Sequence, residues 1–300
     1  MDSSTKHGTG AAHDKFREIE PSRAKKLASK SLNIPTLPEV VRKMREMIAD
    51  PKSGAADVGK LVAQDPPLAA KVLKIANSAF YGLAQRTVST EQACTILGLR
   101  VLRNVVTQAA VMTRYEHLGG RGLDLDALWR HCQLVAQVSF HLARASRANL
   151  GLTPEEIQAC GLLHDLGKVV LLESLGDEYA TVLDLSRTQG LPTHVAEKRI
   201  LGFDHTDVGA LVAVQWGLPA TVAGVIQYHH GPREAVAASP AVALVANANL
   251  VVHRFDAGNL VAAAGTLDPD TQRFLGLDGA AVTGVVELLQ QWSASGGMAA

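Results

Sequence analysis

The stretch Cys160-Gly161-Leu162-Leu163-His164-Asp165-Leu166-Gly167-Lys168 places a polar cluster inside an otherwise apolar helical segment. Burying His and Asp side chains costs free energy unless each finds a partner, so something must satisfy this cluster. Two interpretations fit the stretch taken alone. In one, His164 and Asp165 are adjacent metal ligands, and Lys168, one helical turn further on, meets an anion over the same pocket. In the other, His164 and Asp165 form a hydrogen-bonded pair in an ordinary core.

Length and composition indicate a globular protein of one large or two small domains. The chain has 300 residues, 47% of them hydrophobic, which is ample for a sizeable core. Lys and Arg together number 29, as do Asp and Glu, so the formal charge is zero and gives no strong nucleic-acid signal. Three cysteines without a close pair argue against a disulfide framework and a thiolate zinc site. No apolar run approaches the ~20 residues of a membrane span and no secretion signal is evident, so we expect a cytoplasmic protein without a membrane partner.

The spacing of apolar residues predicts an all-α fold in which an N-terminal helical bundle packs on a second helical bundle. We expect a flexible tail over residues 1–31, the N-terminal bundle over 32–120 and the second bundle over 121–260. Gly119-Gly120 marks the boundary between the bundles. Further helices and a small-residue tail fill residues 261–300. One helix is expected to carry Ile157, His164 and Lys168 on a common face.

Histidines enter the apolar stripes of the predicted helices from residue 122 onward. Each of the following lies on a buried face or at the end of a predicted helix: His131, His164, His205, His229 and His230. The last long apolar helix contributes a polar residue, Asn249, to its buried stripe. The other histidines suit a solvated or packing role and are excluded from the predicted site: His7, His13, His117, His141, His194 and His253.

The number of inward histidines favours a shared pocket over separate core positions. A single buried histidine is more often a satisfied core residue than a ligand. Burying five imidazoles and Asp165 separately, however, would leave many donors and acceptors to pair off. Imidazole and carboxylate ligands without thiolate suit iron, manganese, zinc or nickel rather than a structural zinc site. The sequence therefore predicts a divalent metal as the cofactor, if there is one.

Two regions of the chain resemble known families. The segment Leu162–Lys168, with the histidines before and after it, resembles the HD superfamily of metal-dependent phosphohydrolases. In the N-terminal bundle, four segments closely resemble the HDOD domain, the HD-related output domain of bacterial signalling proteins: Leu37–Val40, Gln64–Leu68, Ile75–Tyr81 and Ala93–Gly98. The resemblance covers residues 32–255 and implies bacterial origin, a role in signal transduction and an HD-like second bundle. Many HDOD members are thought to be non-catalytic because their HD ligands are eroded.

The histidines also resemble those of the HD-GYP phosphodiesterases, which cleave cyclic di-GMP. That resemblance implies the metal ligands His131, His164, Asp165, His205, His229 and His230. In an active enzyme Asp165 would hold or deprotonate a water molecule and Lys168 would stabilise the phosphate. Two features depart from the pattern: no Gly-Tyr-Pro motif follows His230, and the expected final aspartate is Asn249, or alternatively Asn247. An amide keeps an oxygen donor but removes a negative charge, which weakens binding of a divalent ion.

Three functions therefore remain open from the sequence. The first is a regulatory binding or output module, without efficient phosphohydrolase activity, whose partner is a signalling protein or a nucleotide and which works as a monomer or a homodimer. The second is a metal-dependent phosphohydrolase or cyclic di-GMP phosphodiesterase, with Asp165 and Lys168 in the catalytic roles. In the third, the N-terminal bundle docks a partner and the histidines only support it, so His131→Leu would be stable and functional.

Overall fold

The computed structural model describes residue 32 and residues 38–77, 87–231 and 233–294. All regular structure within these residues is helical, which confirms the predicted all-α fold. None of the described helices has the length and apolar character of a membrane span. Several predicted features lie outside the described residues: the tail over 1–31 with His7 and His13, Leu37, the segment Ser78–Tyr81, Pro232 and residues 295–300.

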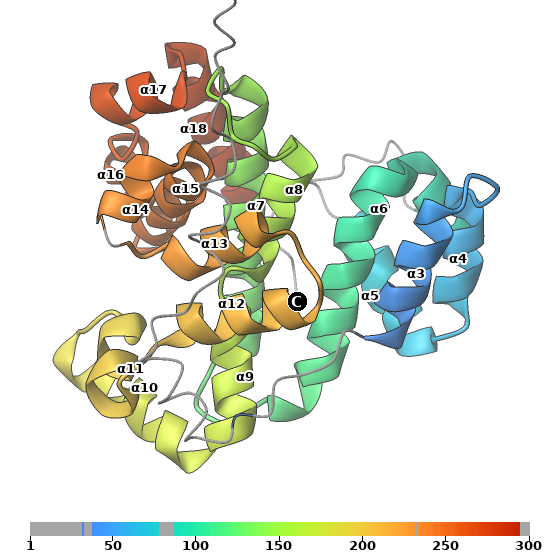
Figure 1. Ribbon diagram of the computed structural model, residues 1–300, viewed down its shortest axis with the longest axis horizontal. Coiled ribbons are helices and arrows are strands. Elements are labelled where there is room, and N and C mark those ends of the chain that lie inside the picture. The colour runs from blue at the N-terminus through green and yellow to red at the C-terminus, as the bar shows by residue number, and fades with distance from the viewer. Residues whose placement is uncertain (1–31, 33–37, 78–86, 232, 295–300) are drawn as a thin grey trace, which may run out of the picture.

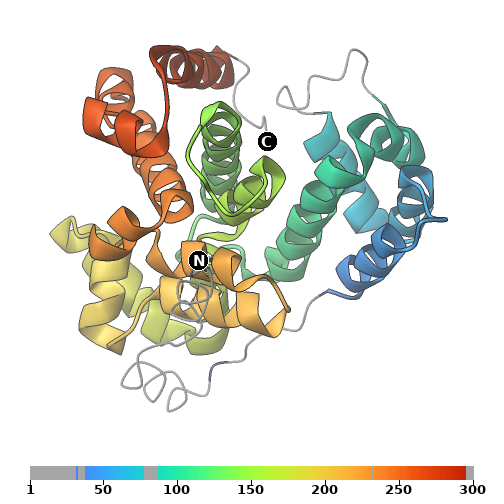
Figure 2. The same ribbon diagram turned by 45° about the horizontal axis from the view of Figure 1, so that its top comes forward.

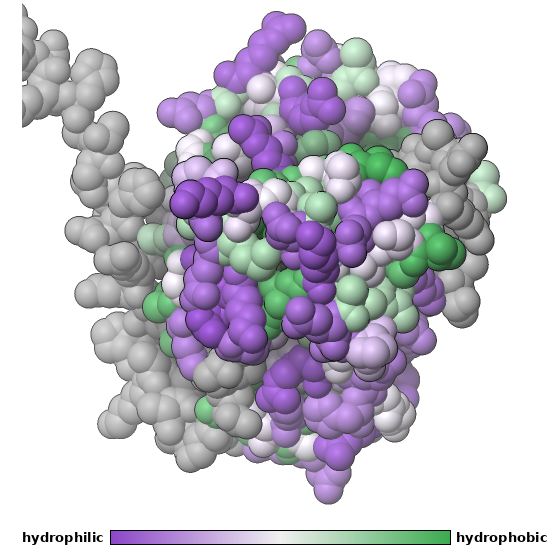
Figure 3. All heavy atoms as spheres, turned by 90° about the vertical axis from the view of Figure 1, so that its right-hand side faces the viewer, coloured by the Kyte–Doolittle hydropathy of each residue, from purple (hydrophilic) through white to green (hydrophobic). Residues whose placement is uncertain are grey.

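The N-terminal bundle comprises α3 (Glu39–Ala49), α4 (Ala55–Ala63), α5 (Pro66–Ala76) and α6 (Thr90–Tyr115), followed by the 3-10 helix η2 (Glu116–Leu118). These helices form the blue-to-teal group in Figure 1. Asp65 begins α5, because its side chain accepts a hydrogen bond from the Leu68 N–H at 3.1 Å. Gly98, with φ of 70°, kinks α6 and divides it into two helical parts. Hydrophilic side chains predominate on the face of the molecule that Figure 3 shows. On the exposed surface of α3, Arg42 pairs with Glu39 and Glu46.

The rest of the chain builds the second bundle and the C-terminal helices. The second bundle contains α7 (Leu125–Ala145), α8 (Pro154–Leu163), α9 (Leu166–Leu175), α10 (Asp177–Gln189), α11 (Thr193–Leu201), α12 (His205–Gln215), α13 (Ala220–Tyr228), α14 (Arg233–Ala238) and α15 (Pro240–Asp256). The C-terminal helices are α16 (Leu260–Ala264), α17 (Pro269–Leu275) and α18 (Gly279–Ala294). Figure 2 shows α7 and α8 between the N-terminal bundle on one side and helices α15–α18 on the other. One continuous core of buried apolar residues extends through both bundles and the C-terminal helices.

The prediction of one helix that carries Ile157, His164 and Lys168 is wrong. That segment is divided into α8, which ends at Leu163, and α9, which begins at Leu166, with His164 and Asp165 in the turn between them. The break lies at Asp165, whose backbone has a non-helical φ of −98° and ψ of 7°.

Two glycines allow the helices around this turn to approach closely. A Cβ atom at Gly161 would lie 2.6 Å from the Ala136 Cα, so glycine lets α8 press against α7. A Cβ atom at Gly167 would lie 1.9 Å from the carbonyl oxygen of His205, so α9 contacts the first residue of α12 through its backbone. The glycines therefore bring the His164-Asp165 turn directly against the helix that carries His205.

Candidate metal centre

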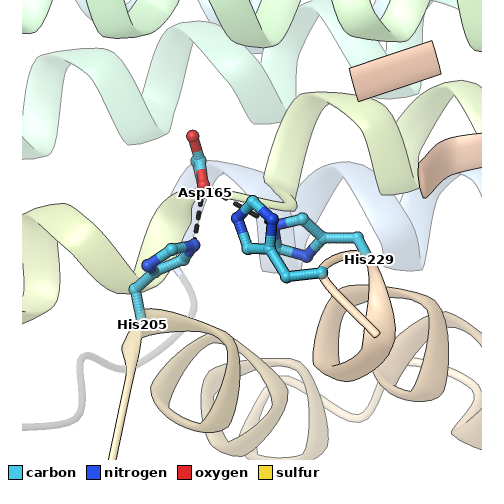
Figure 4. Close-up of side chains that lie close together, drawn as sticks. Asp165, His205 and His229 are labelled. Atoms are coloured by element: carbon cyan, nitrogen blue, oxygen red, sulfur yellow. Dashed lines mark ion pairs between the residues drawn. The ribbon is translucent and has the colours of Figure 1, made fainter. Parts of the chain in front are cut away.

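Asp165 lies at the centre of a buried group of imidazole rings (Figure 4). Its Oδ1 atom lies 3.0 Å from His205 Nε2 and 3.7 Å from His229 Nε2. Its Oδ2 atom lies 3.4 Å from His164 Nε2. Each histidine comes from a helix end: His164 follows α8, His205 begins α12 and His229 follows α13. Four side chains that are distant in sequence therefore meet because four helices end at the same place.

Four polar atoms in this group have no hydrogen-bond partner among the described residues. They are His164 Nε2, Asp165 Oδ1, His205 Nε2 and His229 Nε2, and all are buried, although His205 Nε2 and Asp165 Oδ1 lie 3.0 Å apart as an ion pair. Leaving such atoms unpaired costs free energy, about 1–3 kcal/mol for each group. The possible ligand atoms form two groups that share Asp165, one with His205, His229 and His230 and one with His131 and His164, and within each group the atoms lie within 4.8 Å of one another. A metal ion bound by such a group would supply the missing partner.

The other ring nitrogens orient the histidines toward this point. His164 Nδ1 lies 2.7 Å from the Gly161 carbonyl oxygen, and His229 Nδ1 lies 2.7 Å from the Ile226 carbonyl oxygen. Because a carbonyl only accepts, both Nδ1 atoms donate, and each neutral ring keeps the lone pair of Nε2 directed into the cluster. Metal-ligating histidines have this arrangement, with one nitrogen bound by the protein and the other free for the ion.

Glu197 of α11 holds His205 in the same way. Its Oε2 atom accepts from His205 Nδ1 at 2.6 Å and from the His205 backbone N–H at 2.9 Å, and its Oε1 atom accepts from the Tyr179 hydroxyl at 2.7 Å. The sequence analysis missed Glu197, since Glu197-Lys198-Arg199 looks like a solvated charged face of a helix. No local signal marks this glutamate, because its contact exists only when α11 folds back onto the start of α12.

The charges in the cluster favour a cation beside Asp165 but also favour a proton on His205. Burial lowers the pKa of His164 to about 3, which keeps its ring neutral. Burial would raise the pKa of Asp165, but the neighbouring Lys168 and His164 hold it well below its usual value. Burial would lower the pKa of His205, but the Glu197 carboxylate outweighs this effect and raises the pKa to about 9. Asp165 is therefore a carboxylate at neutral pH, and a cation binding there would compete with the proton on His205.

Lys168 lies in the first turn of α9 and pairs with Asp165. Its Nζ atom lies 2.7 Å from Asp165 Oδ2, and 12% of its side chain is exposed. The ammonium group therefore pairs with Oδ2 of Asp165 and leaves Oδ1 to face His205 and His229. The prediction that Lys168 lies over the same pocket agrees with this position, but its closest charged partner is Asp165.

His131 and Asn249 lie beside the cluster rather than among its unpaired atoms. His131 Nε2 is 2.9 Å from Asn249 Oδ1, and the His131 ring centroid is 5.4 Å from that of His164. With the amide oxygen as acceptor, Nε2 of His131 donates and offers no lone pair. Ligand atoms of His131, His164 and Asp165 nevertheless lie within 4.8 Å of one another, close enough for a second ion. Asn247, the alternative to Asn249, instead donates to the Ala243 carbonyl of its own helix at 2.8 Å.

Three more histidines surround the cluster. His230 offers a ligand atom within 4.8 Å of those of Asp165, His205 and His229, as the sequence predicts. The structure also places two excluded histidines at the rim: His194 stacks on His230 with ring centroids 4.2 Å apart, and His253 lies 4.5 Å from His131. His194 belongs to α11 and His253 to the last turn of α15. The local spacing of apolar residues does not predict where these helices lie relative to the cluster.

The fold and the cluster define an all-α protein of the HD type, with histidines and an aspartate converging at helix ends. The family model for the HDOD domain matches residues 34–232, and the chain belongs to the HDOD domain family. This result confirms the resemblance inferred from the N-terminal motifs.

The chain is also similar to solved structures and to a curated protein. The chain is similar to the crystal structure of an HDOD domain protein with unknown function from Geobacter sulfurreducens, with a TM-score of 0.73, 26% identity and coverage of 92% of this chain and 96% of that one. It is also similar to a structure named "Putative phosphohydrolase" from Shewanella amazonensis SB2B, with a TM-score of 0.71, 25% identity and the same coverage. An uncharacterized protein of Treponema pallidum (strain Nichols) is 28% identical over 239 residues, which cover 78% of this chain and 45% of that protein. The chain thus spans less than half the length of this relative.

Proposed function

We propose that this protein is a regulatory HDOD module that binds a divalent metal ion and acts through a partner rather than by efficient hydrolysis. The observation that carries the proposal is the group of ligand atoms from Asp165, His205, His229 and His230, which lie within 4.8 Å of one another. Three of them, Asp165 Oδ1, His205 Nε2 and His229 Nε2, are buried without a hydrogen-bond partner among the described residues. Asp165, His205, His229 and His230 would hold the ion, and His164 belongs to a second group of possible ligands with His131 and Asp165. Iron, manganese, zinc and nickel suit this ligand set. The partner we propose is a signalling protein or a nucleotide, bound by a monomer or a homodimer.

The distribution of negative charge supports binding over hydrolysis. A metal ion in such a site can supply Lewis acidity and lower the pKa of a bound water molecule. Asp165 is the single carboxylate among the four unpaired ligands, and Lys168 neutralises its other oxygen at 2.7 Å. Asn249 brings an uncharged amide where the resemblance implies a carboxylate, and that amide is bonded to His131. The site therefore has little remaining negative charge for activating a water molecule and little free positive charge for stabilising a phosphate. Both are needed for phosphate hydrolysis.

Metal binding is tested directly on the purified protein. After expression with added iron or manganese, elemental analysis is expected to find a stoichiometric transition metal, and its removal by a chelator should lower the melting temperature. An ion at 100 times its Kd stabilises the folded state by about 2.7 kcal/mol. His229→Ala should lose the metal, whereas His117→Ala, at an exposed histidine of η2 outside the cluster, should keep it. A protein without metal in every preparation contradicts the proposal.

A phosphohydrolase is the second candidate function. It is supported by the name of the Shewanella amazonensis structure, which is 25% identical, and by the two groups of possible metal ligands that share Asp165. The assay is hydrolysis of cyclic di-GMP and of simple phosphate esters by the metal-loaded protein. Turnover that disappears in His164→Ala would favour the enzyme over the regulatory module, while metal binding without turnover would favour the module.

A further inference from the structure

A cavity of about 250 Å³, partly open to solvent, lies where the two bundles meet. Its walls come from α3 and α6 of the N-terminal bundle, from α8, and from the turn between α12 and α13 (Figure 1). None of the proposed metal ligands lines it. An occupant would therefore contact both bundles without touching the proposed metal ion.

Arg103 of α6 brings an unpaired positive charge to this wall. The residue is partly buried, and its guanidinium has no hydrogen bond or ion pair with any residue that the structure describes. Arg45 of α3 also lines the cavity, and one of its N–H groups donates to the Trp216 carbonyl at 2.8 Å. Glu156 is the single carboxylate of the wall, and its Oε2 atom accepts from the backbone N–H and the hydroxyl of Thr153 at 2.9 and 3.1 Å. The Arg103 guanidinium is therefore left without a counter-ion.

The charges around the cavity suit one additional negative charge. Two arginines and one carboxylate give its lining residues a net charge of +1. An adjoining hollow shares Arg103 and Glu156 and adds one charge of each sign, from Arg100 and Glu155, so the excess remains. A guanidinium presents its N–H groups in a fork that matches the two oxygens of a carboxylate. The wall therefore favours a monoanion over a phosphate monoester, which carries nearly two charges at neutral pH.

The rest of the wall is mainly apolar. Leu162 of α8 contributes to it, as do Trp216 and Pro219 from the turn between α12 and α13. Two amide residues also lie in the wall, but Asn104 is 2% exposed and Gln108 is 4% exposed, so we assign no contact to either amide. A concave, mostly apolar site with a charged group at one place is typical of a small-molecule site.

We propose that this cavity binds a small organic carboxylate that has one negative charge and a compact apolar body. Arg103 would pair with the carboxylate, and the apolar wall would cover the body. Leu163, which also lines the cavity, directly precedes His164, so the occupant lies against the end of α8 that leads into the metal cluster. Because the cavity is lined by residues of both bundles, this occupant would also stabilise their packing against each other.

The test is a ligand-observed NMR titration of the full chain at low ionic strength with phenylacetate, phenylacetamide and acetate. Phenylacetate is expected to bind with a Kd of about 1 mM or tighter. Phenylacetamide keeps the shape but lacks the charge, and acetate keeps the charge but lacks the ring, so each should bind at least about tenfold more weakly. Phenyl phosphate, which is a dianion at pH 8, should bind no more tightly than phenylacetate.

Two arginine variants locate the charge that binds the probe. Arg103→Met removes the guanidinium but keeps an apolar stem, and should weaken phenylacetate binding at least about tenfold. Arg100→Met is the matched control, since it removes the same charge from the same helix outside the wall of this cavity, and it should bind like the wild type. Arg103→Lys keeps the charge but loses the fork, so its affinity should lie between those of the wild type and Arg103→Met.

A third variant keeps the test decisive if Arg103→Met does not fold. Ala159→Leu adds bulk to the cavity wall and should abolish binding of phenylacetate while the metal content stays that of the wild type. That combination separates this site from the metal cluster, where a carboxylate would coordinate a bound ion. The proposal is overturned if phenylacetate does not bind at millimolar concentration, if phenylacetamide or acetate binds equally well, or if phenyl phosphate binds more tightly. Binding by Arg103→Met or Ala159→Leu that equals that of the wild type also overturns it.

Discussion

Glu197 and His205 are joined by two hydrogen bonds to the same carboxylate oxygen, one from the ring Nδ1 at 2.6 Å and one from the backbone N–H at 2.9 Å. The pair fixes both the ring and the first turn of α12. The contact also directs Nε2 of His205 toward Asp165. Glu197 therefore decides where one of the unpaired ligand atoms points, although it touches none of those atoms itself.

The first prediction concerns this glutamate. Glu197→Gln is expected to weaken metal binding about tenfold, because the amide keeps an acceptor for Nδ1 but loses the charge that stabilises the orientation and basicity of the ring. Competition with a chelating dye measures the affinity. Glu173→Gln is the matched control, since Glu173 pairs with Arg114 at 3.3 Å and does not contact the cluster. Equal affinities of Glu197→Gln and the wild type would show that Glu197 has no part in the site.

The second prediction concerns the contact between α9 and α12. Gly167→Ala would place a Cβ atom 1.9 Å from the His205 carbonyl oxygen, so the two helices must move apart. We expect the free energy of unfolding to fall by about 1–3 kcal/mol or more, measured by urea denaturation. Gly279→Ala, at the start of α18 where a Cβ atom meets nothing within 4 Å, should change it by about 0.5 kcal/mol or less. A stable Gly167→Ala protein would contradict the close approach of these helices.

The third prediction restores a carboxylate to the last long helix. Asn249→Asp adds a negative charge beside His131 and near the cluster, and should raise the affinity for a divalent ion by about tenfold. The control is Asn247→Asp, two residues earlier, where the side chain bonds to its own helix and the affinity should stay close to that of the wild type. Calorimetric titration with manganese distinguishes the two. A larger gain for Asn247→Asp would place the final ligand at the other asparagine.

The fourth prediction tests whether the histidines are only packed support for a docking surface, in which case His131→Leu is stable. In the structure this change leaves the buried Asn249 Oδ1 without the His131 Nε2 donor at 2.9 Å. The expected loss is about 1–3 kcal/mol of unfolding free energy. Urea denaturation of His131→Leu beside the wild type gives the answer, and unchanged stability would favour the docking interpretation.

Local chemistry in the sequence was sufficient to predict most helices and part of the site. Caps and apolar spacing are properties of neighbouring residues, as the Thr153–Glu156 capping box of α8 and the start of α5 at Asp65 show. The predicted ligands His164, Asp165, His205 and His229 are brought together by the structure, although their role in binding metal stays a prediction. A count of inward polar residues was enough to find them, because a core cannot hold so many without a common partner.

The tertiary structure alone decided the partners of those residues. The break between α8 and α9 depends on Gly167 meeting the backbone of His205, a residue 38 positions away in a different helix. Glu197 and Gln108 look like ordinary polar helix residues in the sequence, and both are buried only because distant helices cover them. The spacing of apolar residues shows which face of a helix is buried but not what lies opposite that face. The sequence by itself therefore determined the all-α fold and the candidate ligands. The packing of the helices decided how those ligands are held.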